Sequence, residues 1–213
     1  AFDAVAQLKK KKDVFLCIAG STHEGEEELL FDVYARIRRT HPNFELLLAP
    51  RHLNRLSSIE NQARRRGVSL KRVSSTPNNG YDDNKDSCGV LVLDEMGVLA
   101  RLYETADAVF VGGSLVSKGG HNLVEPAFFG KPVLFGPHMQ NFAEMAREFK
   151  ENKAALEVAD AAGLEKALIF LMESPAERRA LGEAAKALVA ARQQSIRENL
   201  QAFLDTVKPL EVQ

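Results

Sequence analysis

Short apolar runs alternate along this chain with longer segments that carry apolar residues at helical spacing. The apolar runs predict buried strands at residues 14–19, 44–49, 90–93, 108–111 and 132–135. The longer segments predict helices at residues 26–39, 53–66, 98–104, 123–129 and 142–151. Continuous apolar runs suit strands that are covered on both faces. The alternation therefore predicts an α/β fold with a Rossmann-like, doubly wound parallel sheet, in which ligands bind beyond the carboxyl ends of the strands.

The pattern changes near residue 161 and becomes helical. Residues 164–173, 176–191 and 195–207 predict C-terminal helices, with a break at Ser174-Pro175. Residues 76–87 are rich in turn formers and charge, which predicts a mobile loop. Residues 1–213 are thus expected to form a single domain. The first residues lead into Lys9–Lys12 without a clear first element, so we expect this domain to be part of a longer protein.

Composition narrows the possible functions. The 28 basic and 29 acidic residues give a formal net charge of −1, so bulk attraction to nucleic acid is not expected. Cys17 and Cys88 lack the paired spacing of a zinc or redox motif, which fits a reducing compartment. No apolar run approaches the roughly 20 residues of a membrane-spanning helix, and the chain is expected to be soluble.

A glycine-rich segment at residues 112–126 follows a predicted strand and leads into a predicted helix. Glycines let backbone N–H groups approach an anion closely, and the start of a helix adds unpaired donors and a positive dipole end. This geometry predicts a phosphate site. The residues of the segment that are candidates to face the ligand are Gly113, Ser114, Gly119, Gly120 and His121.

Glu125 lies about one turn into the helix that follows these glycines. From that position its carboxylate can accept hydrogen bonds from both hydroxyls of a ribose, as an acidic residue does in dinucleotide-binding folds. Phosphate and ribose would then be bound together. The alternative is that the glycines serve only tight turns and that Glu125 is a solvated acid of the first helical turn.

The loop after the first predicted strand has a similar character. Gly20 would admit a close ligand, and Ser21 or Thr22 is able to cap the next helix. For the acidic residues at 26–28 we favour a solvated first helical turn, where acids suit the helix dipole.

Two further loops follow predicted strands. Arg51 comes directly after Pro50, and a guanidinium there can bind phosphate or carboxylate through two hydrogen bonds. The alternative for Arg51 is a surface residue at a helix start. Met96 and Gly97 could pack a thioether on a nucleobase and free backbone groups for its edge, although a methionine after a strand is more often part of the core.

The loop after the last predicted strand carries His138, Gln140 and Asn141 and could hold a sugar. The alternative is a structural loop in which Asn141 caps the next helix. The four histidines at positions 23, 52, 121 and 138 fall on four separate loops and lack the spacing of common metal sites. We therefore expect no metal.

Several of these motifs together resemble one family. They stand at residues 20–27, 50–52, 110–115, 119–122, 125–126 and 136–138. In them the chain resembles the bacterial Kdo transferases, GT-B glycosyltransferases that move 3-deoxy-D-manno-octulosonic acid (Kdo) from CMP-Kdo onto the lipid A precursor. The resemblance covers essentially the whole chain. It implies that this is the C-terminal, donor-binding half of a GT-B fold, and that an N-terminal acceptor domain with the catalytic carboxylate base is absent from the chain.

The resemblance also implies particular residues. By motif, the CMP-contacting positions of the family fall on Pro50, Arg51, Met96, Gly97, Val98, Asn122, Leu123, Val124 and Glu125. Val98 stands where the family usually has glutamate, and Leu123-Val124 stands where Pro-Leu is common. Ala1 occupies the place of a lysine that often precedes Phe-Asp. No catalytic residue is expected within the chain, which alone would be inactive.

The leading hypothesis is a glycosyl transfer in which CMP leaves the donor. Arg51 and the helix start at Asn122 would meet the phosphate, and Glu125 would fix the ribose. No cofactor is expected. The complete protein would act on a lipid acceptor at the cytoplasmic side of the bacterial inner membrane, and Lys9–Lys12 would either touch that anionic surface or form a solvated stretch. Alternatives are another GT-B sugar-nucleotide enzyme, such as a UDP-sugar transferase or an epimerase, and a non-catalytic nucleotide-binding partner domain.

Overall fold

The computed structural model describes residues 2, 5–6, 8, 13–75 and 89–206, with side chains to residue 199. The loop predicted to be mobile at 76–87, together with Cys88 and Lys9–Lys12, lies outside the described residues. Cys17 is described and is fully buried in the first strand.

The described residues form one seven-stranded sheet, and all of its pairings are parallel. The strands are β1 (Phe15–Thr22), β2 (Phe44–Pro50), β3 (Ser69–Arg72), β4 (Gly89–Val92), β5 (Ala108–Val111), β6 (Val133–Phe135) and β7 (Ala155–Glu157). Their order is β3-β4-β2-β1-β5-β6-β7, so β2, β3 and β4 lie on one side of β1 and β5, β6 and β7 lie on the other. The predicted doubly wound sheet is confirmed, with its switch point between β1 and β5.

The sequence did not predict β3 and β7, which are the two edge strands of the sheet. β3 reads Ser-Leu-Lys-Arg and none of its residues is fully buried. β7 is three residues long and ends in the exposed Glu157. An edge strand has a neighbour on one side only and less cover, so it lacks the continuous apolar run that identified the central strands.

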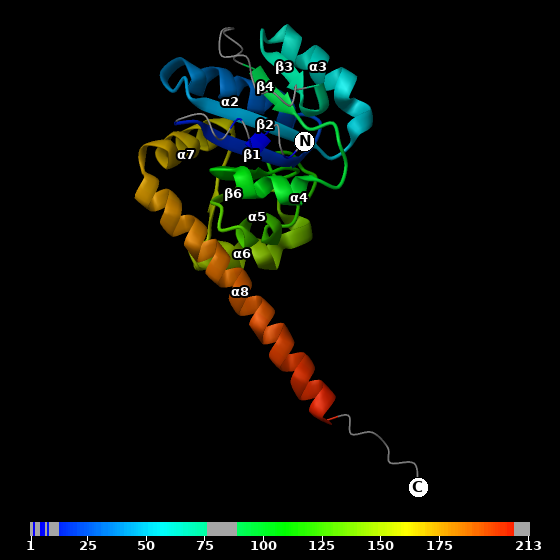
Figure 1. The fold of residues 1–213 in the computed structure, drawn as a ribbon, viewed down its shortest axis with the longest axis vertical. Helices are drawn as coiled ribbons and strands as arrows, with labels where there is room; N and C mark the ends of the chain where they lie inside the picture. The colour runs from blue at the N-terminus through cyan, green and yellow to red at the C-terminus, as the bar shows by residue number, and fades with distance from the viewer. Residues whose placement is uncertain (1, 3–4, 7, 9–12, 76–88, 207–213) are drawn as a thin grey trace.

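Helices cover both faces of the sheet in a three-layer arrangement (Figure 1). One face is covered by α2 (Glu26–Thr40), α3 (Leu56–Arg65) and α7 (Ala161–Glu173). The other face is covered by α4 (Leu99–Leu102), α5 (Val124–Phe128), α6 (Ala143–Glu151) and the first half of α8 (Pro175–Thr206). Single 3₁₀ turns are η1 (Leu53–Arg55), η2 (Val73–Ser75), η3 (Tyr103–Thr105) and η4 (Gln140–Phe142). Each helix predicted between residues 26 and 173 is present, with shifts of its ends.

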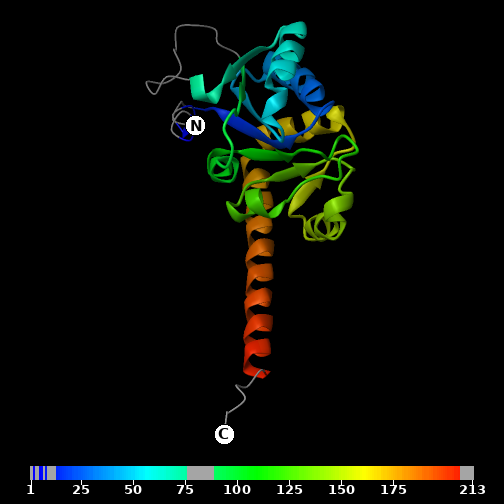
Figure 2. The same cartoon turned by 90° about the vertical axis from the view of Figure 1, so that its right-hand side faces the viewer.

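The predicted break at Ser174-Pro175 separates α7 from α8. Proline suits the first position of α8 because it has no N–H group to leave unpaired there. The helices predicted at residues 176–191 and 195–207 are instead one helix, α8, which the structure describes as far as Thr206. It packs on the core through Ala185 and Val189, and residues 190–199 are exposed where the helix extends away from the sheet (Figures 1 and 2). No helix among the described residues has both the length and the apolar content that crossing a bilayer requires.

Candidate functional site

The loops that follow β1, β2, β4 and β5 meet at the carboxyl edge of the sheet and enclose a pocket of about 230 Å³. Its lining residues are Ser21, Ala49, Pro50, Arg51, Leu53, Leu93, Glu95, Met96, Gly97, Leu99, Ala100 and Glu125. We call it the Arg51 pocket. It brings together residues that the sequence selected on four separate loops.

The Arg51 pocket has a buried apolar floor and exposed polar walls. Ala49 and Leu93 are buried, whereas Arg51 and Glu125 are exposed. Met96 is 67% exposed, so the alternative that places it in the core is wrong. The arrangement can receive a flat apolar group on the floor while a guanidinium and a carboxylate reach its polar atoms.

The backbone of this pocket is also adapted to a close ligand. Gly97 has φ of 81°, a left-handed conformation that favours glycine, and no other atom lies within 4 Å of the place a side chain would take. The N–H of Arg51 donates to the carbonyl oxygen of Thr22 at 3.0 Å. This bond fixes the loop after β2 on the loop after β1.

Other predicted contacts have structural roles in the described chain. The side chain of Leu123 is fully buried, and Val98 and Val124 pack against the same core from partly buried positions. The side-chain oxygen of Asn122 accepts the N–H of Val124 at 3.0 Å, at the start of α5. A ligand could meet Leu123 through the backbone alone, because its side chain faces the core.

The glycine loop holds an anion, and that anion belongs to the chain itself. The carboxylate of Glu26 accepts the N–H groups of Gly113 at 2.7 Å and of Ser114 and Leu115 at 3.0 Å each. It also accepts the N–H of His23 at 3.0 Å. Glu26 is fully buried, so the prediction of a solvated first turn is wrong for this residue. Burial raises the pKa of its carboxyl, and the four N–H donors oppose that rise.

Further contacts inside the glycine loop are internal as well. The hydroxyl of Ser114 donates to the carbonyl of Val111 and accepts the N–H of Gly136 at 2.8 Å. The N–H of Gly120 donates to the carbonyl of Gly113 at 2.9 Å. These hydrogen bonds hold the loop after β5 to itself and to the end of β6. Contact of a ligand with this segment stays a prediction.

Glu27 forms a second buried contact at the start of α2. Its carboxylate has no exposed surface and meets the guanidinium of Arg55 at 2.9 and 3.2 Å. The hydroxyl of Thr22 donates to the same carboxylate at 3.1 Å, so the prediction that Thr22 or Ser21 caps the helix is wrong. Helix α2 follows Gly25 in a left-handed conformation without a side-chain cap. The ion pair ties the start of α2 to η1, next to Arg51.

Three of the four histidines that the sequence places on separate loops, His23, His52 and His121, converge in space. The Nε2 atoms of His23 and His121 lie 2.9 Å apart, with their ring planes 7° from parallel. The ring of His52 stands edge-on to His23 with centroids 5.8 Å apart. Burial lowers the pKa of His23 to about 4, and the charges of neighbouring basic groups contribute to that fall; burial also lowers the pKa of His121. In the part of the chain that the structure describes, no cluster of His, Cys, Asp or Glu has the geometry of a metal site.

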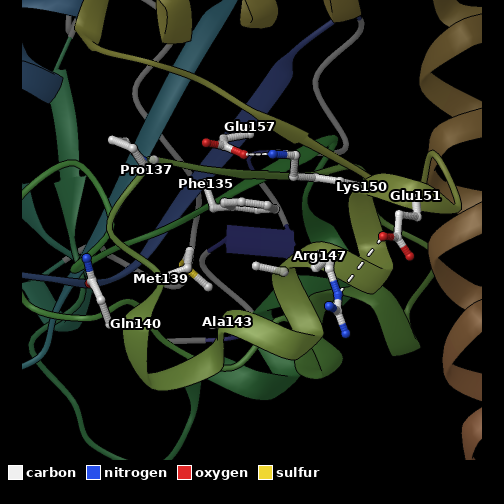
Figure 3. Close-up of a pocket in the computed structure, with 11 residues that line it drawn as sticks. Phe135, Pro137, Met139, Gln140, Ala143, Arg147, Lys150, Glu151 and Glu157 are labelled. Atoms are coloured by element: carbon white, nitrogen blue, oxygen red, sulfur yellow. Dashed lines mark ion pairs between the residues drawn. The ribbon is translucent and has the colours of Figure 1, made fainter.

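A second pocket, of about 450 Å³, lies beyond the ends of β6 and β7 (Figure 3). Its floor is apolar, and its charged residues are paired with one another: Lys150 with Glu157, and Arg147 with Glu151 at 4.0 Å. The loop with His138 and Asn141 borders this region.

The histidine and asparagine of that loop hold it to the glycine loop. The N–H of His138 donates to the carbonyl of Ser114 at 2.9 Å, and the amide side chain of Asn141 donates to the carbonyl of Lys118 at 3.3 Å. No side chain caps η4 or α6, so the alternative that Asn141 caps the next helix is wrong.

The sequence of residues 83–188 matches a protein-family model described as glycosyl transferases group 1. The chain is 36% identical to the 3-deoxy-D-manno-octulosonic acid transferase of Haemophilus influenzae, over 93% of this chain and 45% of that protein. The chain belongs to the Kdo transferase family. This confirms the resemblance drawn from the motifs. A bifunctional glycosyltransferase/methyltransferase of Fusobacterium nucleatum is 38% identical over 71% of this chain and 22% of its own length.

Among solved structures, this chain matches the C-terminal CMP-Kdo binding domain of WaaA from Acinetobacter baumannii. The TM-score is 0.77 at 25% identity, and the match covers 87% of this chain and 95% of that domain. The chain therefore has the fold of one GT-B half. It spans less than half the length of the curated Kdo transferases it matches.

Proposed function

We propose that this chain is the donor-binding domain of a Kdo transferase and that it binds CMP-Kdo. The complete protein would transfer Kdo to a lipid A precursor at the cytoplasmic side of the bacterial inner membrane. A second domain, expected before residue 1, would bind that acceptor. The family, the fold of the Acinetobacter CMP-Kdo binding domain and the shape of the Arg51 pocket all support this proposal.

The observation that carries the proposal is the joint presence of Arg51, Met96-Gly97 and Glu125 in one pocket at the carboxyl edge of a parallel sheet. Each group suits one part of CMP. The thioether of Met96 and the open backbone of Gly97 suit the base, the guanidinium of Arg51 suits the phosphate, and the carboxylate of Glu125 suits the ribose hydroxyls.

These roles define a transfer step. The bond between the sugar and the CMP phosphate breaks, the electron pair leaves with the phosphate, and Arg51 offsets the charge that develops there. The acceptor hydroxyl forms the new bond to the sugar and gives its proton to a carboxylate of the acceptor domain. Closure of the two domains would exclude water from the donor. No residue of this chain is assigned a proton transfer.

Isothermal titration with CMP tests the site directly. Arg51→Ala and Glu125→Ala should each weaken CMP binding by about 10- to 100-fold, because each removes a hydrogen bond to a charged group of about 1.5–3 kcal/mol. Arg147→Ala is the matched control, since Arg147 is an exposed arginine of the second pocket. The proposal fails if the wild-type chain does not bind CMP or if both variants bind it as tightly as the control does. Stronger binding of UDP than of CMP would favour a UDP-sugar enzyme instead.

A further inference from the structure

A cluster of basic side chains lies beside the Arg51 pocket at the same edge of the sheet. His23, His52 and His121 form its core, with the Nε2 contact of 2.9 Å between His23 and His121. His23 follows Ser21 by two residues and His52 follows Arg51 directly, and both Ser21 and Arg51 line the Arg51 pocket. The cluster is therefore contiguous with the proposed nucleotide site.

The charges around these rings are positive. The charges of Lys118 and Arg55 act on His23, and the charge of Arg51 acts on His121. His52 acts on both rings. These charges favour the neutral form of both rings, and an anion at this point would offset them.

The two buried carboxylates at the start of α2 are directed elsewhere. Glu26 accepts four backbone N–H groups, and Glu27 is held by Arg55 and the hydroxyl of Thr22. Within the described residues, no carboxylate makes a hydrogen bond to the ring of His23, His52 or His121. The rings thus lie among cationic side chains, and within the described residues they make no hydrogen bond to a carboxylate of the protein.

We propose that His23, His52 and His121 form the subsite for the carboxylate of the donor sugar. This inference rests on the proposed function, because the nucleotide must occupy the Arg51 pocket. The relatives are named as transferases of 3-deoxy-D-manno-octulosonic acid, and an acid of this kind carries a carboxylate at neutral pH in addition to the phosphate of the nucleotide. The donor then presents two anions, and the crevice presents the guanidinium of Arg51 beside three imidazoles whose ring N–H groups can donate to a carboxylate.

The contact between His23 and His121 suggests how the subsite receives this carboxylate. One neutral ring donates its Nε2–H to the Nε2 of the other, so the two rings share one proton at their contact. A carboxylate that displaced this ring-to-ring hydrogen bond would accept an N–H from each ring and would raise the pKa of both imidazoles. Binding of the sugar acid should therefore take up a proton and become tighter as the pH falls from 8 to 6.

The test uses CMP and free Kdo as probes, with NMR signals of the imidazole nitrogens as the readout. In the CMP-saturated wild-type chain, Kdo should shift the ring nitrogens of His23 and His121, and it should bind more tightly at pH 6 than at pH 8. The double variant His23→Gln/His121→Gln should bind Kdo at least 10-fold more weakly and CMP within about threefold of wild type. His41→Gln is the control, because His41 is a partly buried histidine at the far end of α2.

The outcomes separate the two proposals. Absence of CMP binding to the wild-type chain would overturn the proposed function and this subsite with it. Normal CMP binding with equal Kdo affinity in the double variant and in wild type would overturn the subsite alone. A 10-fold loss of CMP affinity in the double variant would assign the cluster to the phosphate instead.

Equal binding of the Kdo methyl ester, which lacks the negative charge, would contradict recognition of a carboxylate. A fluorescence unfolding curve of the variant that matches wild type would exclude loss of folding as the cause.

Discussion

The glycine loop and the Arg51 pocket lie at the same edge of the sheet but differ in how their polar groups are used. In the glycine loop, the N–H groups of Gly113 and Ser114 are buried and donate to Glu26. In the Arg51 pocket, Arg51 and Glu125 are exposed and face an open cavity. The difference shows that a glycine-rich segment after a strand can be a structural joint, and that the ligand site is marked by polar groups that the protein leaves accessible.

The largest expected effect on stability comes from removing the buried ion pair between Glu27 and Arg55. Glu27→Ala would leave Arg55 partly buried without its partner, and removal of one member of a buried ion pair costs about 3–5 kcal/mol. Urea unfolding should show this loss in the free energy of unfolding. Glu28→Ala is the matched control, since its exposed pair with Arg66 is expected to contribute less than about 1 kcal/mol. Equal losses in the two variants would contradict a structural role for the Glu27 ion pair.

The next effect concerns the carboxylate in the glycine loop. Glu26→Gln replaces one acceptor oxygen by an NH₂ donor, which would face backbone N–H groups of the loop. Because buried donors would lose their acceptor, we expect a loss of about 2–3 kcal/mol in the free energy of unfolding. Thermal and urea unfolding both measure it. A variant as stable as wild type would show that Glu26 does not hold the loop.

A smaller effect is the pH dependence of stability at the histidine cluster. Burial lowers the folded-state pKa of His23 from its ordinary value of 6.5 to about 4, so the unfolded chain binds more protons between these two values. The stability that comes from neutral His23 is present above pH 6.5 and is lost as the pH falls toward 4. After a discount for solvent screening, we expect a loss of about 1–2 kcal/mol.

Unfolding experiments from pH 7 to pH 4 check this expectation. The double variant His23→Gln/His121→Gln should lose less stability over this range than wild type. Glu26 has a raised pKa and acts in the opposite sense, but it is present in both proteins and cancels in the comparison. Parallel pH profiles for the two proteins would be inconsistent with lowered pKa values at the cluster.

The smallest expected effect concerns Met96 in the Arg51 pocket and tests CMP affinity separately from stability. Met96→Ala should leave the free energy of unfolding within about 0.5 kcal/mol of wild type, because the side chain is exposed. It should weaken CMP binding by about fivefold, since a thioether on a ring contributes about 1 kcal/mol. Calorimetric titration and thermal unfolding of the same sample measure the two effects. A destabilised variant with normal CMP affinity would reverse the roles assigned to the two regions.

The sequence predicted the parts of the fold that have a strong local pattern. The central strands β1, β2, β4, β5 and β6 carry continuous apolar runs, whereas the edge strands β3 and β7 do not and were missed. The break before Pro175 was predicted because proline is a local signal. The continuity of α8 past residue 191 was not predicted, because the spacing of apolar residues does not indicate it.

The sequence also selected the residues of the Arg51 pocket, because Arg51, Met96 and Glu125 each follow a predicted strand and fall in family motifs. It missed the burial of Glu26. An acid in a first helical turn is usually solvated, and its partners lie 87 to 89 residues away in another loop. The contact between His23 and His121 depends on the β1–β5 pairing, which the strand order determines and a single sequence does not show.

The central claim is that CMP binds in the Arg51 pocket and that the glycine loop keeps its contact with Glu26. A CMP titration followed through the backbone amide signals of the ¹⁵N-labelled chain tests it most directly. We predict that the largest shifts occur at Arg51, Gly97 and Glu125, with smaller shifts at Gly113, Ser114 and Leu115. The largest shifts at those three loop residues, with little change at Arg51 and Glu125, would contradict the account.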